Sequence, residues 1–105
     1  MMTGAELSHQ VKNLGEFYTQ EDFTDMDCRD IDLSGGIFSE VKFDRCNFSA
    51  ADLHETTFSN CSFIDAIFDH CQLNSTKFIK SNMTRASLQR AQLKSIKVIE
   101  CNLKS

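Results

Sequence analysis

Five cysteines and three histidines are the side chains of this 105-residue sequence that are suited to metal binding or nucleophilic chemistry. Thiolates and imidazoles are the usual protein ligands of zinc, and a cysteine next to a base can act as a nucleophile. The eight residues are Cys28, Cys46, Cys61, Cys71, Cys101, His9, His54 and His70. The cysteine number is odd and no two cysteines form a CxxC pair, so the spacing indicates no zinc cluster and no disulfide framework. His70 directly precedes Cys71, and the structure that carries them decides whether they meet.

The fold that carries these residues is predicted by a repeat of five residues. A large apolar residue recurs at nearly every fifth position from residue 23 to residue 103, as in the stretch FDRCNFSAADLHETTFSNCSFIDAIFDHCQL. We predict these positions as the structural core: Phe23, Leu33, Phe38, Phe43, Phe48, Leu53, Phe58, Phe63, Phe68, Leu73, Phe78, Met83, Leu88, Leu93, Val98 and Leu103, with Cys28 as the small exception. Two residues before each of these centres the side chain is usually small. A period of five belongs to neither helix nor strand, so it indicates a solenoid whose stacked units share one core.

Their positions in the five-residue repeat argue against a catalytic role for the cysteines and histidines. Cys46, Cys61, Cys71 and Cys101 fall in the small inward slot, where a cysteine behaves as a small hydrophobe. His70 and Cys71 point to opposite sides because adjacent side chains of an extended chain alternate. The sequence has no EF-hand loop and no phosphate-binding glycine loop. We therefore expect no catalytic, cofactor-binding or metal-ligating residues, no cavity for a small-molecule substrate inside the filled coils, and no enzyme.

The unit ADLHE at residues 51–55 matches the A(D/N)Lxx motif in full, and the sequence here resembles the pentapeptide-repeat family over residues 21–105. The resemblance implies an all-β fold, a right-handed quadrilateral β-helix with four repeats per coil and about four coils. Residues twenty apart would then stack. The sequence supports that spacing independently, because it aligns an unbroken ladder of leucines: Leu33, Leu53, Leu73 and Leu93.

The segment before the repeats predicts a cover for the first coil. Leu7, Val11, Leu14 and Tyr18 recur at helical spacing, and Thr3 with Glu6 fits a capping box. We expect a short amphipathic helix over residues 4–18, within an N-terminal capping segment of residues 1–20 that precedes the repeat domain of residues 21–105. No comparable cap is predicted at the C-terminal end. That end would meet a second copy, a partner, or further chain.

Charge is sorted along the predicted rod. Residues 1–70 hold fourteen Asp or Glu against four Lys or Arg, whereas residues 71–105 hold one against seven, within a formal net charge of -4. These residues are either a solvated surface or ends that dock on partners of opposite charge. Head-to-tail self-association is a third consequence. No apolar run is long enough to span a membrane and no signal peptide or lipidation motif is visible, so we expect a cytoplasmic protein without a membrane role.

Outward isoleucines add a candidate interaction surface, which we predict to comprise Ile37, Ile79, Ile99, Lys80, Arg85, Arg90 and Lys97. The leading hypothesis is a non-catalytic scaffold or adaptor. It would bind another protein, or form a homodimer, through the faces and the uncapped C-terminal end of a rigid rod. The resemblance supplies an alternative, because some bacterial members of the family mimic DNA and bind type II topoisomerase (DNA gyrase). Direct nucleic-acid binding is disfavoured because the basic segment has no aromatic stacking platform.

Overall fold

The chain begins with the helix α1, Gly4–Leu14. The computed structural model describes residues 2–15 and 17–105. Thr3 accepts a hydrogen bond from the Glu6 amide and the Glu6 carboxylate accepts one from the Thr3 amide, which confirms the predicted capping box. The helix ends four residues earlier than predicted. Gly15 adopts a left-handed conformation (φ 63°) and its amide bonds back to Gln10, a C-terminal cap that suits a glycine.

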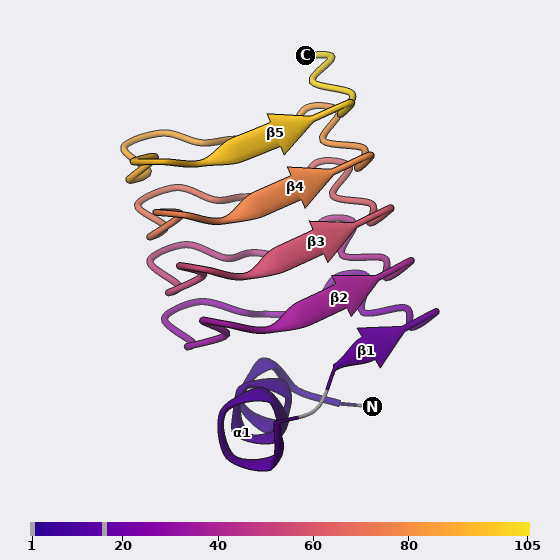
Figure 1. Cartoon of the computed structure of the whole chain (residues 1–105), viewed down its shortest axis with the longest axis vertical. Coiled ribbons are helices and arrows are strands. Elements are labelled where there is room, and N and C mark those ends of the chain that lie inside the picture. Colours follow the sequence, from indigo (N-terminus) through magenta and orange to yellow (C-terminus); the bar gives the residue numbers. More distant parts are fainter. Residues whose placement is uncertain (1, 16) are drawn as a thin grey trace.

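Five short strands form one side of a solenoid (Figure 1). They are β1 (Tyr18–Thr19), β2 (Ile37–Ser39), β3 (Thr57–Ser59), β4 (Lys77–Ile79) and β5 (Lys97–Ile99). The strands are parallel and stand in sequence order, and each residue pairs with the residue twenty positions on, as in Phe38 with Phe58. The predicted spacing of twenty is therefore confirmed. The repeat also begins one unit earlier than expected, because Tyr18 pairs with Phe38 in β1 instead of continuing the helix.

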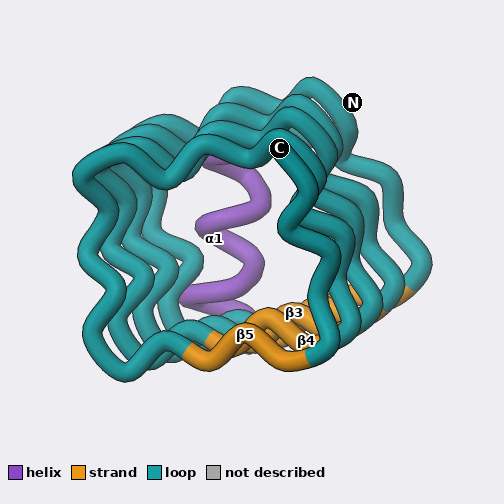
Figure 2. Tube along the Cα trace, turned by 90° about the horizontal axis from the view of Figure 1, so that it is seen from above, coloured by secondary structure: helices purple, strands orange, loops and turns teal. Residues whose placement is uncertain are grey.

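The other three sides are built in the same way with less regular pairing. Single bridges link Asp22 to Lys42, Asp27 to Asn47 and Asp32 to Asp52, and similar bridges continue through the later coils. Seen along the axis, the coils superimpose as a four-sided tube with α1 across one end (Figure 2). The architecture is the right-handed quadrilateral β-helix predicted from the sequence, preceded by a short helix.

Left-handed residues make the corners. A positive φ recurs at every fifth residue from Gln20 to Glu100, always two residues after a core centre, and Gly35 is the one glycine in the series. Across most corners the amide three residues after the centre donates to the centre's carbonyl, as Ala51 does to Phe48 (2.9 Å). Asp or Asn directly before the centre often accepts the amide two residues on, as Asp52 does from His54. This bond gives the D/N position of the motif a physical role.

Stacked phenylalanine rings fill the interior. Phe43 and Phe63 lie 5.3 Å apart and nearly parallel, and Phe63 meets Phe58 edge-on at 4.9 Å. The predicted core positions from Phe23 to Met83 are all buried. Several hydroxyls and thiols in the small slots donate to the carbonyl of the centre 23 residues earlier, as Thr76 does to Leu53. The interior is thus apolar, and its polar atoms are paired with the backbone.

Helix α1 closes the N-terminal end of the tube (Figure 1). Leu7 is fully buried, and Lys12 donates to the carbonyl (3.0 Å) and hydroxyl (2.6 Å) of Ser34. A side chain at Gly4 would lie 2.3 Å from the carbonyl oxygen of Asp27, so only glycine permits this close approach. In the described part of the chain, no helix has the length and apolar character needed to cross a membrane.

The last coil departs from the predicted core. Leu93, Val98 and Leu103 keep the register, but 43%, 40% and 60% of their surfaces are exposed and Leu88 is only partly buried. The prediction of core residues at Leu93, Val98 and Leu103 is wrong for a simple reason. A side chain inside a solenoid is covered from above and below, and in the described structure no coil lies above these residues.

Candidate functional site

The cysteines are buried structural residues. Cys28, Cys46, Cys61 and Cys71 are buried and Cys101 is partly buried. The thiols of Cys46 and Cys101 donate to the carbonyls of Phe23 (3.0 Å) and Phe78 (3.2 Å). Burial raises the pKa of Cys61 to about 11 and that of Cys71 to about 12, so these thiols are poor nucleophiles at neutral pH.

The histidines do not complete a reactive site with them. His54 lies on the surface, where its Nδ1 and the Asp52 carboxylate are 2.6 Å apart, and this hydrogen bond raises the pKa of His54. His70 occupies a left-handed corner position beside Cys71, which is buried. Among the residues that the structure describes, no group of three or more His, Cys, Asp or Glu is placed to hold a metal ion.

The candidate isoleucines divide into two places on the sheet. Ile79 and Ile99 are register partners on β4 and β5, so they lie side by side near the C-terminal end. Ile37 is on β2 and pairs with Thr57 in the next coil, so the structure does not bring it to the other two isoleucines. Instead Ile37 and Phe17 directly precede the paired residues Phe38 and Tyr18, and both are exposed, at 54% and 72%. Sequence analysis missed Phe17 because the repeat was started too late.

The candidate basic residues surround the rod rather than forming one patch. Lys80, Arg85 and Arg90 occupy three successive corners, each with a positive φ. Lys97 pairs with Lys77 on the outer face of β5 and β4. The C-terminal end therefore carries a basic ring on several sides, with the Ile79–Ile99 pair as an apolar feature on one of them.

One corner carries alternating charges that sequence analysis did not detect. Asp25, Arg45, Asp65 and Arg85 follow each other at intervals of twenty. Arg45 donates to Asp25 (2.8 Å) and Arg85 to Asp65 (2.7 Å), and these hydrogen bonds lower the pKa of both carboxylates. Aligning the sequence at twenty would have exposed the pattern. Its consequence is that the acidic part of the rod is not uniformly negative.

The last coil presents an open edge. In the earlier coils the amide of a core centre donates to the carbonyl nineteen residues on, as Phe63 does to Asn82 (2.7 Å) and Met83 to Asn102 (2.7 Å). In the described structure the amides of Leu88, Leu93 and Val98 have no such carbonyl, and β5 pairs with β4 alone. Open backbone groups therefore lie beside exposed apolar side chains.

Comparison with known proteins identifies a matching family model and solved structures of similar fold. A family model described as the SV2A/B/C luminal domain matches residues 3–88. A comparison with curated protein sequences finds no match.

Solved pentapeptide-repeat structures share the fold. One trypsin-treated form of QnrB1, described as a plasmid-mediated fluoroquinolone resistance protein, aligns with a TM-score of 0.81 at 26% identity, over 85% of this chain and 47% of its own. A second form aligns with a TM-score of 0.79 at 23% identity, over 83% and 45%. HetL, a pentapeptide repeat protein from the cyanobacterium Nostoc, aligns with a TM-score of 0.55 at 23% identity, over 77% and 38%. The chain thus spans less than half the length of these proteins.

Proposed function

The chain belongs to the pentapeptide-repeat proteins and to the family described as the SV2A/B/C luminal domain, and we propose that it is a non-catalytic module that binds another protein. The contact is made through the open C-terminal end and the adjoining outer face of β4 and β5. The QnrB1 and HetL structures share the fold with this chain, and a fold hosts many functions. The proposal therefore depends on the surface of this chain.

The open end is the observation that carries the proposal. Leu93, Val98, Ile99 and Leu103 are exposed there, next to the edge of β5. An exposed apolar surface beside a strand edge is suited to pairing with another chain, since backbone hydrogen bonds and apolar contacts form together. A partner protein or a second copy of this chain supplies both.

Charge and rigidity support the choice of partner. Lys94, Lys97 and Lys104 flank the exposed apolar residues, so the proposed partner presents acidic groups around an apolar strand. The coils below are filled with stacked rings, so the surface loses little conformational freedom on binding.

A capture experiment with the whole chain as bait tests the proposal. One stoichiometric protein partner is expected, and changing Ile79 and Ile99 together to Asp should abolish its capture while the thermal unfolding of the bait stays cooperative. Changing Phe17 and Ile37 together to Asp is the matched control at the other end of the sheet, and it should retain the partner. Retention by the Ile79/Ile99 variant excludes this face, whereas a doubled mass of the bait alone in light scattering identifies the partner as a second copy.

A second candidate function is DNA mimicry toward a type II topoisomerase such as DNA gyrase. The similarity to QnrB1 and the fourteen acidic residues before position 71 favour it. Arg45 and Arg85 within the acidic corner, and the basic last coil, speak against a phosphate-like surface. A supercoiling assay with purified gyrase separates the two functions. Protection from a quinolone or inhibition by the chain supports mimicry, and no effect at a large excess of the chain excludes it.

We also propose a reducing location such as the cytoplasm. The cysteines are free, and four of the five are buried in the core. The family description names a luminal domain, which favours the opposite location, because a lumen is a compartment in which disulfides persist. Mass spectrometry of protein that is denatured and alkylated under non-reducing conditions directly on isolation tests the location. Five alkylated thiols are expected, and a disulfide between any two of the cysteines would contradict the proposal.

A further inference from the structure

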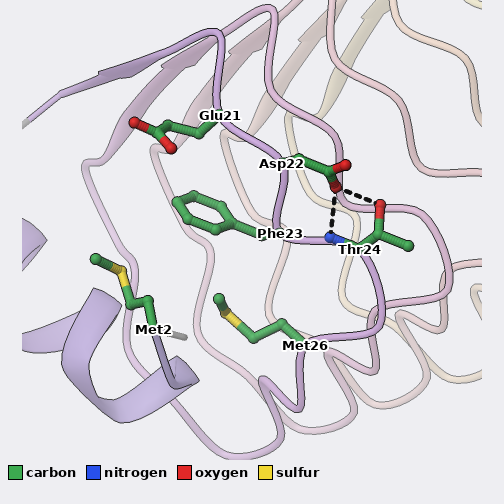
Figure 3. A pocket seen from close by; sticks show the side chains of 6 residues that line it. All are labelled: Met2, Glu21, Asp22, Phe23, Thr24 and Met26. Carbon is green, nitrogen blue, oxygen red and sulfur yellow. Dashed lines mark hydrogen bonds between the residues drawn. The ribbon is translucent and has the colours of Figure 1, made fainter.

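A cavity of about 300 Å³ lies between the segment before α1 and the first coil. It is at the N-terminal end of the rod, opposite the surface proposed for protein binding. Its walls are formed by Met2, Glu21, Asp22, Phe23, Thr24 and Met26 (Figure 3). The coils themselves are filled, as the sequence predicted, but the junction between the cap and the first coil is not.

The floor of the cavity is apolar because the first coil has no coil before it. Phe23 is the first ring of its column and packs against Phe43 on one side (5.7 Å). Met26 occupies the small inward slot that holds Cys46 and Ala66 in the next two coils, so a longer side chain stands where later coils tolerate only small ones. Met2 and Met26 lie on one side of the Phe23 ring, away from the two acidic residues (Figure 3).

An acidic side chain stands in a register position that is otherwise neutral. Glu21 occupies the inward slot two residues before Phe23, and the same slot holds the buried residues Val41, Cys61 and Ser81 in the following coils. Among the inward slots from residue 21 to residue 101, Glu21 is the only charged residue. Unlike those three residues Glu21 is exposed, because no coil lies before the first one, and it borders the cavity.

Asp22 adds a second negative charge at the rim. Its carboxylate accepts hydrogen bonds from the amide (2.9 Å) and the hydroxyl of Thr24, and the hydroxyl bond is the main cause that lowers the pKa of Asp22. The cavity therefore combines thioether and aromatic walls with two carboxylates. Lys42 and Arg45 lie close enough to Asp22 to lower its pKa as well, so Glu21 is the carboxylate on which cation binding depends. Such walls favour an apolar body, and the rim favours a positive charge.

We propose that this cavity binds a small organic cation, an ammonium group carried on a short apolar body. The ammonium pairs with Glu21 at the rim, and the apolar body contacts Met2, Phe23 and Met26. The size agrees with a small ligand, because the cavity lies at the lower limit of about 300 Å³ for ligand pockets. The proposal is independent of the protein-binding function, since the two sites lie at opposite ends of the rod.

The test uses the whole chain and three probes of equal length: hexylammonium, hexanol and hexanoate. Methionine methyl groups are observed by NMR during titration at neutral pH and low salt. The signals of Met2 and Met26 should shift with hexylammonium, with affinity in the roughly millimolar range expected for so small a ligand. Met83 is an internal control, because it lies in the Phe23 column three coils away and is 3% exposed. Its signal should not move.

Two Glu→Gln variants test whether Glu21 is responsible for the preference of the cavity for a cation. Glu21→Gln should weaken hexylammonium binding about three- to tenfold, as expected for removing one nearby charge at the surface, and leave hexanol binding unchanged. Glu55→Gln removes the same charge from an exposed corner far from the cavity and should have no effect. The proposal is overturned if hexanoate binds as tightly as hexylammonium, if Met2 and Met26 do not respond, or if the two variants behave alike.

A capped lysine distinguishes the source of the cation. If it binds as tightly as hexylammonium, the cavity accepts the lysine side chain of another chain. If its amide groups prevent binding, the ligand is a free amine. Thermal unfolding of Glu21→Gln, expected to match the unsubstituted chain, shows that weaker binding does not reflect a lost fold.

Discussion

Residues 41–60 and residues 86–105 each make one full turn of the same solenoid, yet only the first turn has a core. Phe43, Phe48, Leu53 and Phe58 are inaccessible to solvent, whereas none of residues 86–105 is buried. The backbone is the same in both turns. Ala50 and Arg90 each have a φ of 58°, and the corner hydrogen bond of Ala51 (2.9 Å) recurs at Ala91 (3.2 Å). Local geometry therefore follows the repeat, while burial depends on having a coil on both sides.

The largest expected effect tests that dependence within one column. Phe63→Ala should lower the free energy of unfolding by about 3–5 kcal/mol, because it removes a ring packed against Phe43, Phe58, Phe68 and Phe78. Leu103→Ala in the same column should cost less than about 1 kcal/mol, since Leu103 is largely exposed. Urea denaturation measures both. Equal losses would mean that the last coil is buried in solution, for instance in a dimer.

The N-terminal cap allows a third coil to be compared with these two, because a helix covers the first coil where another coil would otherwise lie. Leu7 is fully buried against the first coil, so Leu7→Ala should destabilise the chain by about 2–3 kcal/mol. Leu14→Ala is the matched control on the same helix, where the side chain is 61% exposed and the loss should be below about 0.5 kcal/mol. The same denaturation series reports both. A small effect at Leu7 would show that the first coil is stable without its cap.

Thiol reactivity compares the coils without altering them. Cys101 in the last coil is partly buried, whereas Cys71 is buried and its pKa is raised to about 12. Iodoacetamide at pH 8 should label Cys101 at least about tenfold faster, equivalent to about 1.4 kcal/mol, and Cys71 should react only as the chain unfolds. Peptide mass spectrometry gives both rates, and urea supplies the control in which all five cysteines react. Equal native rates would contradict the difference between the coils.

The smallest effect concerns the surface of the buried turn. The hydrogen bond to Asp52 raises the pKa of His54 above its ordinary value of 6.5, so the folded chain holds this proton more tightly than the unfolded chain does. The resulting stability is complete below pH 6.5 and is lost as the pH rises through the folded-state pKa. Solvent screening limits it to a few tenths of a kcal/mol, since the two side chains are 45% and 28% exposed.

His54→Asn should remove this pH dependence, and His70→Asn, which leaves the Asp52–His54 pair intact, should keep it. Thermal unfolding between pH 5.5 and pH 8.5 measures the difference. A stability that increased with pH through the same range and vanished in the His54 variant would mean that the charged imidazole is disfavoured in the fold.

Much of the fold was predictable because it follows from spacing. The five-residue frame predicted the solenoid, the ladder of leucines predicted the stacking of residues twenty apart, and Thr3 with Glu6 predicted the start of α1. Each of these depends on residues close in the chain or on one constant period. The end of the helix was missed because Tyr18 fits two patterns, the helical stripe and the repeat. Its pairing with Phe38 decides between them.

The candidate surface was less predictable. Ile79 and Ile99 are neighbours and Ile37 is not, because Ile37 stands on the other side of the core centre in its repeat. The basic residues were expected as one surface, but Lys80, Arg85 and Arg90 occupy successive corners and Lys97 lies on β5. Position within the five-residue unit sets these directions, and a residue type alone does not reveal them.

The sequence by itself determined the repeat and the stacking register, because both follow from residue types repeated at a constant interval. The left-handed corners were found only in the structure. Only the tertiary structure decided which register positions are covered. A helix shields the first coil incompletely and leaves a cavity beside Glu21, and nothing in the described chain shields the last coil. Burial depends on which residues lie above and below a side chain in the stack. For the inner coils these residues are twenty positions away in the sequence, for the first coil some of them are on α1, and for the last coil the described chain supplies none on one side.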